Sequence, residues 1–198
     1  MADQHAHDYR LLASETVYDG KIISLRRDTV AMPGGGSGVR EVVHHGGAVG
    51  VVALDDEGRV VLIRQYRHPV RAHLWELPAG LRDVDGEPPV ETARRELAEE
   101  VQLAAQRWSL LTTSYSTPGF CDEQVLIYLA EGLSDVARPE GFVVENEELD
   151  LTVERVPLAD AVQQVFDGTI RNALAVIGLL AAAQLQATAP RLRPLDAD

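Results

Sequence analysis

The sequence predicts an α/β/α sandwich with a mixed β-sheet, preceded by a small N-terminal β-module. The first observation is that most of the chain consists of short apolar or alternating segments separated by turn residues, a pattern typical of strands. The second is that helical periodicity is confined to one segment in the middle of the chain and two near its end. Strands that surround one helix and are followed by two more indicate helices packed on a shared sheet.

The N-terminal module is expected to cover residues 1–45. Residues 15–30 alternate apolar and polar side chains around a central turn, so they predict two short strands. Residues 32–38 are too rich in glycine for a regular element and are expected to form a loop at a hairpin tip. Residues 39–45 are again strand-like.

The second domain, residues 46–198, is expected to carry the remaining strands and all three helices. Apolar runs and alternation predict its strands at residues 48–55, 59–67, 74–78, 108–116, 123–132 and 151–158. The sequence "DDEG" between the first two is a turn signal, so these two strands should pair as a hairpin. A 3.6-residue period predicts its helices at residues 88–101, 158–167 and 170–187.

The composition narrows the class of protein. The chain has 198 residues and a formal net charge of −13, without a basic run that could follow a phosphate backbone, so no nucleic-acid partner is expected. Cys121 is the only cysteine, which favours a reducing compartment. The N-terminus is polar and acidic, unlike a signal peptide, and the longest apolar run, residues 173–185, is too short to span a bilayer. We therefore expect a cytoplasmic protein without a membrane partner.

The helix over residues 88–101 has an apolar stripe that must face the core. At 100° per residue, four apolar side chains fall within about 60° of one direction: Val90, Ala93, Leu97 and Val101. The two prolines at the start of the segment suit a first helical turn, where a missing N–H has no consequence.

Acidic side chains gather around this helix. The segment from Pro78 to Glu100 holds seven carboxylates. Glu96, Glu99 and Glu100 are spaced i,i+3 and i,i+4, so their side chains converge, and Glu99 can pair with Arg95 at i,i+4. Like charges at this spacing cost a helix roughly 0.2–0.5 kcal/mol each, and a divalent cation such as Mg²⁺ would remove the conflict. The alternative is an ordinary charged surface helix.

The same segment resembles the signature of the Nudix hydrolases, Gly-x5-Glu-x7-Arg-Glu-U-x-Glu-Glu-x-Gly-U, where U is a bulky aliphatic residue. The resemblance rests on Gly80, Glu87 and the run Arg95-Glu96-Leu97-Ala98-Glu99-Glu100, with Leu103 in the last position. The sequence departs from the signature twice, because six residues separate Gly80 from Glu87 and Gln102 replaces the final glycine. The extra residue precedes the helix and leaves the acidic face intact. Gln102 occupies a helix-end position that glycine adopts more easily.

The resemblance implies hydrolysis of a nucleoside diphosphate linked to another group, in which water attacks a phosphorus and metal ions neutralise charge. It implies that Glu96 and Glu100 are the main metal ligands and that Glu99 adds a ligand or a water-mediated contact. The backbone carbonyl of Ala79 is implied as a further ligand. Arg95 would orient the acids through salt bridges.

Features outside the signature resemble the ADP-ribose pyrophosphatase branch of the family. Pro118 lies sixteen residues beyond position 102, where that branch has a proline; a plain turn proline is the alternative. The segments "IRQYRHP" and "LWELPAG" are also similar to that branch. The resemblance implies that Arg67 contacts the pyrophosphate with its planar guanidinium and that Glu123 holds the terminal ribose or a metal-bound water. The alternatives are a surface arginine and a solvated loop acid.

The general base is implied to be a glutamate on a loop well after the signature. The segment "EGFVVENEELDL" offers Glu145, Glu147 and Glu148. Counting back from the strand-to-helix junction at residues 156–161 favours Glu147, and its two neighbours stay as alternatives.

The expected activity is therefore Mg²⁺-dependent hydrolysis of ADP-ribose to AMP and ribose 5-phosphate, with Mn²⁺ as an alternative ion. Similar enzymes form intertwined homodimers through an N-terminal β-module, so a homodimer is implied, with Arg40 reaching the partner's active site. Three alternatives remain. They are a Nudix hydrolase for another nucleoside diphosphate sugar such as GDP-mannose, a non-catalytic sensor that binds a nucleotide sugar, and an interaction scaffold with a charged helix.

Overall fold

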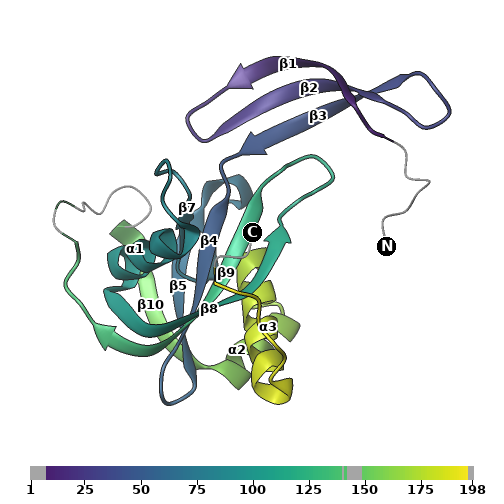
Figure 1. The fold of residues 1–198 in the computed structure, drawn as a ribbon. Helices are drawn as coiled ribbons and strands as arrows, with labels where there is room; N and C mark the ends of the chain where they lie inside the picture. Colours follow the sequence, from purple (N-terminus) through teal and green to yellow (C-terminus); the bar gives the residue numbers. More distant parts are fainter. Residues whose placement is uncertain (1–7, 140, 142–148, 196–198) are drawn as a thin grey trace. The chain divides into compact units, whose positions relative to one another are not determined.

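The computed structural model describes residues 8–139, 141 and 149–195, and the chain divides into two compact units. The first unit contains the N-terminal residues up to Gly47 together with Tyr115–Gln124. The second unit spans Ala48–Ser114 and Val125–Asp198. Figure 1 shows the elements of each unit, coloured along the sequence.

Three antiparallel strands form the sheet of the first unit: β1 (Leu11–Asp19), β2 (Ile23–Ala31) and β3 (Ser37–His45), in the order β1-β2-β3. The two strands expected within residues 15–30 are present, and the first begins four residues earlier than expected. The glycine-rich segment between β2 and β3 is a turn in which three consecutive glycines, Gly34, Gly35 and Gly36, have φ of 83°, 95° and 83°. Only glycine adopts such a run without steric strain.

The segment Tyr115–Gln124 belongs to the first unit because it pairs with the end of β3. Cys121 forms a parallel bridge with Val43. The Val43 N–H donates to the carbonyl of Phe120 (2.7 Å), and the Asp122 N–H donates to the carbonyl of Val43 (3.1 Å). A loop far along the chain is therefore hydrogen-bonded to an N-terminal strand.

The second unit contains one mixed sheet. Its strands are β4 (Ala48–Leu54), β5 (Arg59–Arg67), β6 (Ala72–Glu76), β7 (Ala79–Leu81), β8 (Leu103–Tyr115), β9 (Gln124–Asp135) and β10 (Thr152–Pro157), with a short 3-10 helix, η1 (His68–Val70), after β5. The hydrogen-bonded order is β10-β5-β4-β9-β8, with β6 added to β5 and β7 added to β4. β4 and β9 are parallel, whereas β5 is antiparallel to β4, β6 and β10.

In the part of this unit that the structure describes, helices cover the two faces of the sheet: α1 (Pro89–Val101), α2 (Leu158–Phe166) and α3 (Ala173–Thr188). Alternate residues of β4 point to opposite faces, as expected for a strand. Val49, Val51 and Ala53 pack in one core cluster with buried residues of α1. Val52 and Leu54 pack in a second cluster with buried residues of α2 and α3. The expected α/β/α sandwich with a mixed sheet and a preceding β-sheet is confirmed.

β8 begins five residues before the expected strand. Two other differences from the sequence pattern, at β7 and α3, have identifiable reasons. β7 is absent from the predicted strands because three residues carry no periodicity, and only pairing with β4 makes this segment a strand. α3 begins at Ala173 instead of residue 170 because Asn172 caps it. The Asn172 side chain accepts a hydrogen bond from the Ala175 N–H at 3.0 Å. Within the described residues, no helix is long and apolar enough to cross a membrane.

Helix α1 buries the predicted stripe and ends on a left-handed residue. Ala93 and Leu97 are fully buried, and Val90 and Val101 pack against the same core cluster. Gln102 has φ 55° and ψ 43°, and its N–H bonds to the carbonyls of the last helical turn. The helix thus stops where a glycine would stop it, although a residue with a Cβ atom is strained at positive φ.

Replacing Gln102 with glycine should raise the free energy of unfolding by about 0.5–1 kcal/mol, because relief of the backbone strain exceeds the extra entropy that glycine loses on folding. Urea denaturation measures the change. Gln102→Ala is the matched control, since it removes the same side chain but keeps the Cβ atom, and its stability should not rise. If both variants gained the same free energy of unfolding, the strain would lie in the Gln102 side chain and not in its backbone.

Candidate active site

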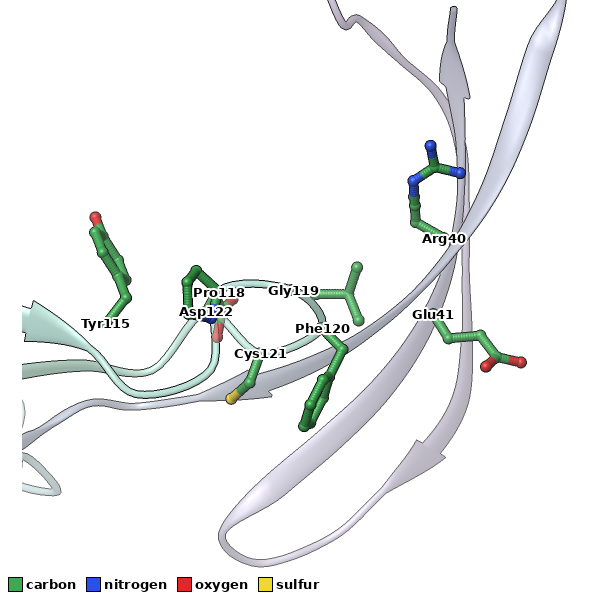
Figure 2. A pocket seen from close by; sticks show the side chains of 9 residues that line it. Arg40, Glu41, Tyr115, Pro118, Gly119, Phe120, Cys121 and Asp122 are labelled. Carbon is green, nitrogen blue, oxygen red and sulfur yellow. The ribbon is translucent and has the colours of Figure 1, made fainter. Parts of the chain in front are cut away.

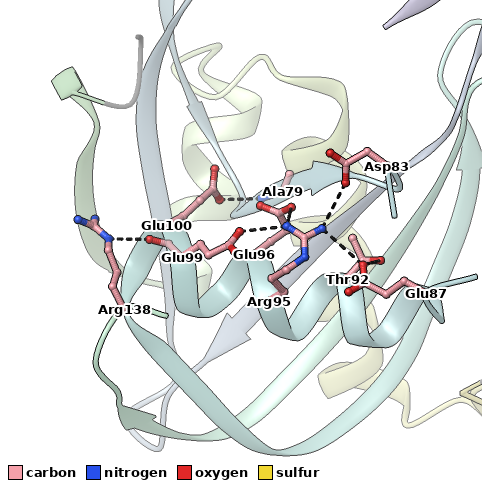
Figure 3. Close-up of polar contacts among 9 residues, drawn as sticks. All are labelled: Ala79, Asp83, Glu87, Thr92, Arg95, Glu96, Glu99, Glu100 and Arg138. Carbon is pink, nitrogen blue, oxygen red and sulfur yellow. Dashed lines mark hydrogen bonds and ion pairs between the residues drawn. The ribbon is translucent and has the colours of Figure 1, made fainter. Parts of the chain in front are cut away.

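Arg95 lies at the centre of the acidic face of α1 (Figure 3). Its Nη1 donates to Glu96 Oε1 at 2.8 Å and to Glu99 Oε2 at 3.0 Å, so the ion pair expected at i,i+4 is present. Its Nη2 lies 3.4 Å from Glu87 Oε2 and 3.5 Å from Asp83 Oδ1. Burial alone would lower the pKa of Arg95, but the charges of Glu96, Glu99 and Glu87 outweigh burial and raise it. One guanidinium therefore faces four carboxylates.

Glu87 connects Arg95 to the start of the helix. Thr92 is fully buried, and its Oγ1 donates to Glu87 Oε2 at 2.8 Å. Pro88, at the N-cap position, supplies no side-chain hydrogen bond. Glu87 therefore links the loop before the helix to the first turns of α1. The N-cap residue makes no such link through its side chain.

Glu96 is the carboxylate in the most restricted environment of this cluster. Its side chain is 13% exposed, and a Cβ atom placed on Gly80 would lie only 2.0 Å from its Cδ. A side chain at position 80 would therefore displace the Glu96 carboxylate from its present place. Burial raises the pKa of Glu96 from 4.5 to about 7, with further increases from Glu99 and Asp83 and a decrease from Arg95. The single guanidinium does not fully offset the cost of ionising Glu96 here.

Glu99 and Glu100 are held by contacts from other elements. Glu100 Oε2 accepts a hydrogen bond from the Ala79 N–H at 2.9 Å. The carbonyl of Glu99 accepts one from Arg138 Nε at 2.8 Å. The structure thus places Ala79 beside the acidic face through its N–H.

The acidic face offers the donors that a hard divalent cation prefers, namely carboxylate oxygens from Glu96, Glu99 and Glu100. Within the described part of the chain, no three acidic, histidine or cysteine side chains already gather as a metal cage. In this structure, Arg95 donates to the carboxylates of Glu96 and Glu99, and the Ala79 N–H donates to that of Glu100. The chemistry of these donors therefore fits a divalent metal ion.

Arg67 forms a forked ion pair with a buried acid. Its Nε and Nη2 lie 2.9 Å and 2.7 Å from the two oxygens of Glu76. Glu76 is 1% exposed, whereas the Arg67 side chain is 45% exposed. The fork fixes the plane of the guanidinium. Sequence reasoning missed Glu76, although a single acid in the apolar segment "LWELP" was a usable signal.

Arg40 and Pro118 line one hollow of about 410 Å³ in the first unit (Figure 2). Pro118 lies in a turn in which the Thr117 carbonyl accepts hydrogen bonds from the N–H groups of Phe120 (3.1 Å) and Cys121 (2.9 Å). The hollow is thus built from a strand of the N-terminal sheet and the loop paired with it.

Glu123 lies beside this loop and is only partly exposed. Its Oε1 is 3.6 Å from Nδ1 of His45, and a quarter of its side chain is accessible. The three glutamates considered for the base, Glu145, Glu147 and Glu148, lie outside the described residues. Sequence reasoning also missed Arg138, because no local spacing connects it with Glu99.

In metal-free protein, Glu96→Gln should raise the free energy of unfolding at pH 8 by up to about 3 kcal/mol. Folding raises the pKa of Glu96 from 4.5 to about 7. The wild-type protein therefore becomes less stable as the pH rises through this range, because Glu96 must ionise in a buried place. The advantage of the variant should therefore shrink below pH 7 and vanish near pH 4. Urea denaturation with a chelator across this range measures it.

The matched control is Glu91→Gln, which removes a half-exposed glutamate of the same helix. Its effect should stay within about 0.5 kcal/mol at every pH. A Glu96→Gln variant less stable than wild type at pH 8 would show that the ion pair with Arg95 outweighs the cost of burial.

Two family models together match most of the chain. The model described as the NUDIX domain matches residues 44–175, and the model described as the nucleoside diphosphate sugar hydrolase N-terminal domain matches residues 9–43. The ADP-ribose pyrophosphatase of Mycobacterium tuberculosis is 49% identical over 192 residues, covering 97% of this chain and 91% of that protein. The GDP-mannose pyrophosphatase of Yersinia pestis is 31% identical over 163 residues, covering 79% and 80%.

A solved structure supports the same assignment. The crystal structure of an ADP compounds hydrolase matches with a TM-score of 0.78 at 25% sequence identity, covering 93% of this chain and 98% of that one. Nudix hydrolases generally need a divalent metal, in agreement with the carboxylate donors on α1. From the signature on α1, the fold and these matches together, the chain belongs to the Nudix hydrolase family.

Proposed function

We propose that this protein hydrolyses the pyrophosphate of ADP-ribose to AMP and ribose 5-phosphate, with Mg²⁺ as its metal and Mn²⁺ as an alternative ion. The observation that carries the proposal is the acidic face of α1, where Arg95 orders four carboxylates and Glu96 remains costly to ionise. The 49% identity to an ADP-ribose pyrophosphatase supports this substrate over other nucleoside diphosphate sugars.

The metal would be held by Glu96 and Glu100, with Glu99 as a ligand or a contact through water and the Ala79 carbonyl as a further ligand. A bound divalent cation would neutralise the charge of the pyrophosphate and favour ionisation of water. Arg95 orients Glu96 and Glu99 by direct ion pairs, which limits the side-chain motion that binding must suppress.

Water would attack one phosphorus, the bridging P–O bond would break, and two phosphate monoesters would leave. A base must take a proton from the attacking water, and we assign this role to Glu147 from its place in the sequence. Glu145 and Glu148 are its alternatives.

Four residues would bind the rest of the substrate. Arg67 would contact the pyrophosphate, and its fork to the buried Glu76 supports this role because it fixes the guanidinium plane. Pro118 would bind substrate, Arg40 would contact substrate in the partner's active site, and Glu123 would hold the terminal ribose or a metal-bound water.

A homodimer formed through the N-terminal module, residues 1–45, is part of the proposal, with Arg40 reaching the partner's active site. All nine residues of β1 are exposed, including the large apolar side chains Leu11, Leu12 and Tyr18. Exposed apolar surface of this kind is typical of interaction sites, so a second copy of the chain would cover it.

The remaining expectations rest on composition and on the intact acidic set. A net charge of −13 and a single cysteine support a cytoplasmic enzyme without nucleic-acid or membrane partners. The intact set of Arg95, Glu96, Glu99 and Glu100 argues against a non-catalytic sensor. GDP-mannose remains the alternative substrate because a GDP-mannose pyrophosphatase is 31% identical to this chain over 163 residues.

With Mg²⁺ present, kcat/KM should be highest for ADP-ribose in a panel that includes GDP-mannose and other nucleoside diphosphate sugars. The products, AMP and ribose 5-phosphate, are separated and quantified by chromatography. Removal of metal by a chelator should abolish turnover, and Mn²⁺ should restore it. A much higher kcat/KM for GDP-mannose would overturn the substrate assignment but not the family.

Glu147→Gln should lower kcat by about 10²–10⁴-fold, because loss of proton transfer affects the chemical step. Binding of metal and of ADP-ribose should remain near wild type, as measured by calorimetry. Glu145→Gln and Glu148→Gln are matched controls from the same segment and should retain most of their kcat. If one of these controls loses kcat while Glu147→Gln keeps it, the base is that neighbour.

A further inference from the structure

The last turn of α1 combines two electrostatic problems. It carries the carboxylates of Glu99 and Glu100 but no basic residue. The carboxyl end of a helix has partial negative charge, so acids in this turn are unfavourable. The last carbonyls of a helix also lack helical hydrogen-bond donors. Both problems fall on the turn that carries the proposed metal ligands.

The segment that follows β9 covers this end of the helix. Its Val136 N–H donates to the carbonyl of Gln102 at 3.0 Å. Its Arg138 Nε donates to the carbonyl of Glu99 at 2.8 Å, a contact drawn in Figure 3. Arg138 therefore supplies a donor to a carbonyl of the last turn and a positive charge to its negative end.

Glu99 is consequently held by an arginine at each of its two parts. Arg95 holds its side chain from within α1, and Arg138 holds its backbone carbonyl from 39 positions further along the chain. The next residue, Glu100, is fixed to the Ala79 N–H. Because the carbonyl of Glu99 and the carboxylates of this turn share one backbone, movement of that carbonyl would reorient both carboxylates.

We infer that Arg138 is a positioning residue for the metal site: it fixes the last turn of α1 so that Glu99 and Glu100 present their carboxylates together with Glu96. The inference rests on the proposed function for the identity of the metal ligands. Arg138 contacts the backbone of the helix and is assigned no contact with substrate.

Two effects of Arg138 on metal affinity oppose each other. Its positive charge repels a cation, which would weaken binding, whereas its hydrogen bond orders the ligands, which would strengthen binding. The guanidinium of Arg138 is exposed, so solvent screens its positive charge. Positioning should therefore dominate, and removal of Arg138 should weaken metal binding.

Binding of Mn²⁺ alone to the full-length protein, followed by the electron paramagnetic resonance signal of the free ion, tests this sign. Arg138→Gln should raise the Kd for Mn²⁺ by roughly 3- to 10-fold, less than the effect of removing a group that contacts a ligand side chain directly. In the metal-free protein, the amide hydrogens of Gln102 and Val136 should exchange faster. At saturating Mg²⁺, kcat should return to within about twofold of wild type, because only positioning is lost.

Arg107→Gln is the matched control, since it removes one exposed arginine that pairs with Glu131 at 3.7 Å and so changes the net charge equally. It should leave the Kd for Mn²⁺ unchanged. Unchanged or tighter Mn²⁺ binding by Arg138→Gln, while Glu100→Gln binds poorly, would overturn the role of Arg138. Normal binding by Glu96→Gln and Glu100→Gln would instead show that the proposed metal face itself is wrong.

Discussion

Arg95 faces four carboxylates with one positive charge, and the geometry of the acidic face depends on this imbalance. Asp83 and Glu87 approach from the loop before α1, and Glu96 and Glu99 approach from the helix itself. The arrangement orders the acids. Burial raises the pKa of Glu96 to about 7, and the charge of Arg95 only partly offsets this. A surface helix would leave such charges to solvent. Here the burial of Glu96 makes its negative charge costly, so a bound divalent cation would stabilise that charge.

The sandwich creates that condition. Ala93 and Leu97 are buried against the sheet, so the rotation of α1 about its axis is fixed. Glu96 lies at the edge of the buried stripe and is therefore pressed against β7, where Gly80 provides the space for its carboxylate. The same strand gives the Ala79 N–H to Glu100. Packing of apolar residues on one side of the helix thus determines where the acids on the adjacent side lie.

The two ends of α1 are stabilised by contacts from outside the helix. At the start, Glu87 bonds to Thr92, although the N-cap residue is a proline. At the end, Gln102 adopts a left-handed backbone. Val136 donates to the carbonyl of this C-cap residue, and Arg138 donates to the carbonyl of Glu99 in the final turn. The acids therefore occupy a helix whose ends are both fixed, which restricts their positions more than helix geometry alone would.

The sequence alone determined the elements whose information is local. The 3.6-residue period defined α1 and its stripe, i,i+4 spacing predicted the Arg95–Glu99 pair, and alternation located most strands. Tertiary structure decided the contacts that depend on sheet register and on pairing between segments far apart in the sequence. Strand β7, the fork between Arg67 and Glu76, the hollow shared by Arg40 and Pro118, and the bond from Arg138 to Glu99 all belong to this group. Their partners come from different segments, and no periodicity within one segment encodes the hydrogen-bond register that brings two segments together.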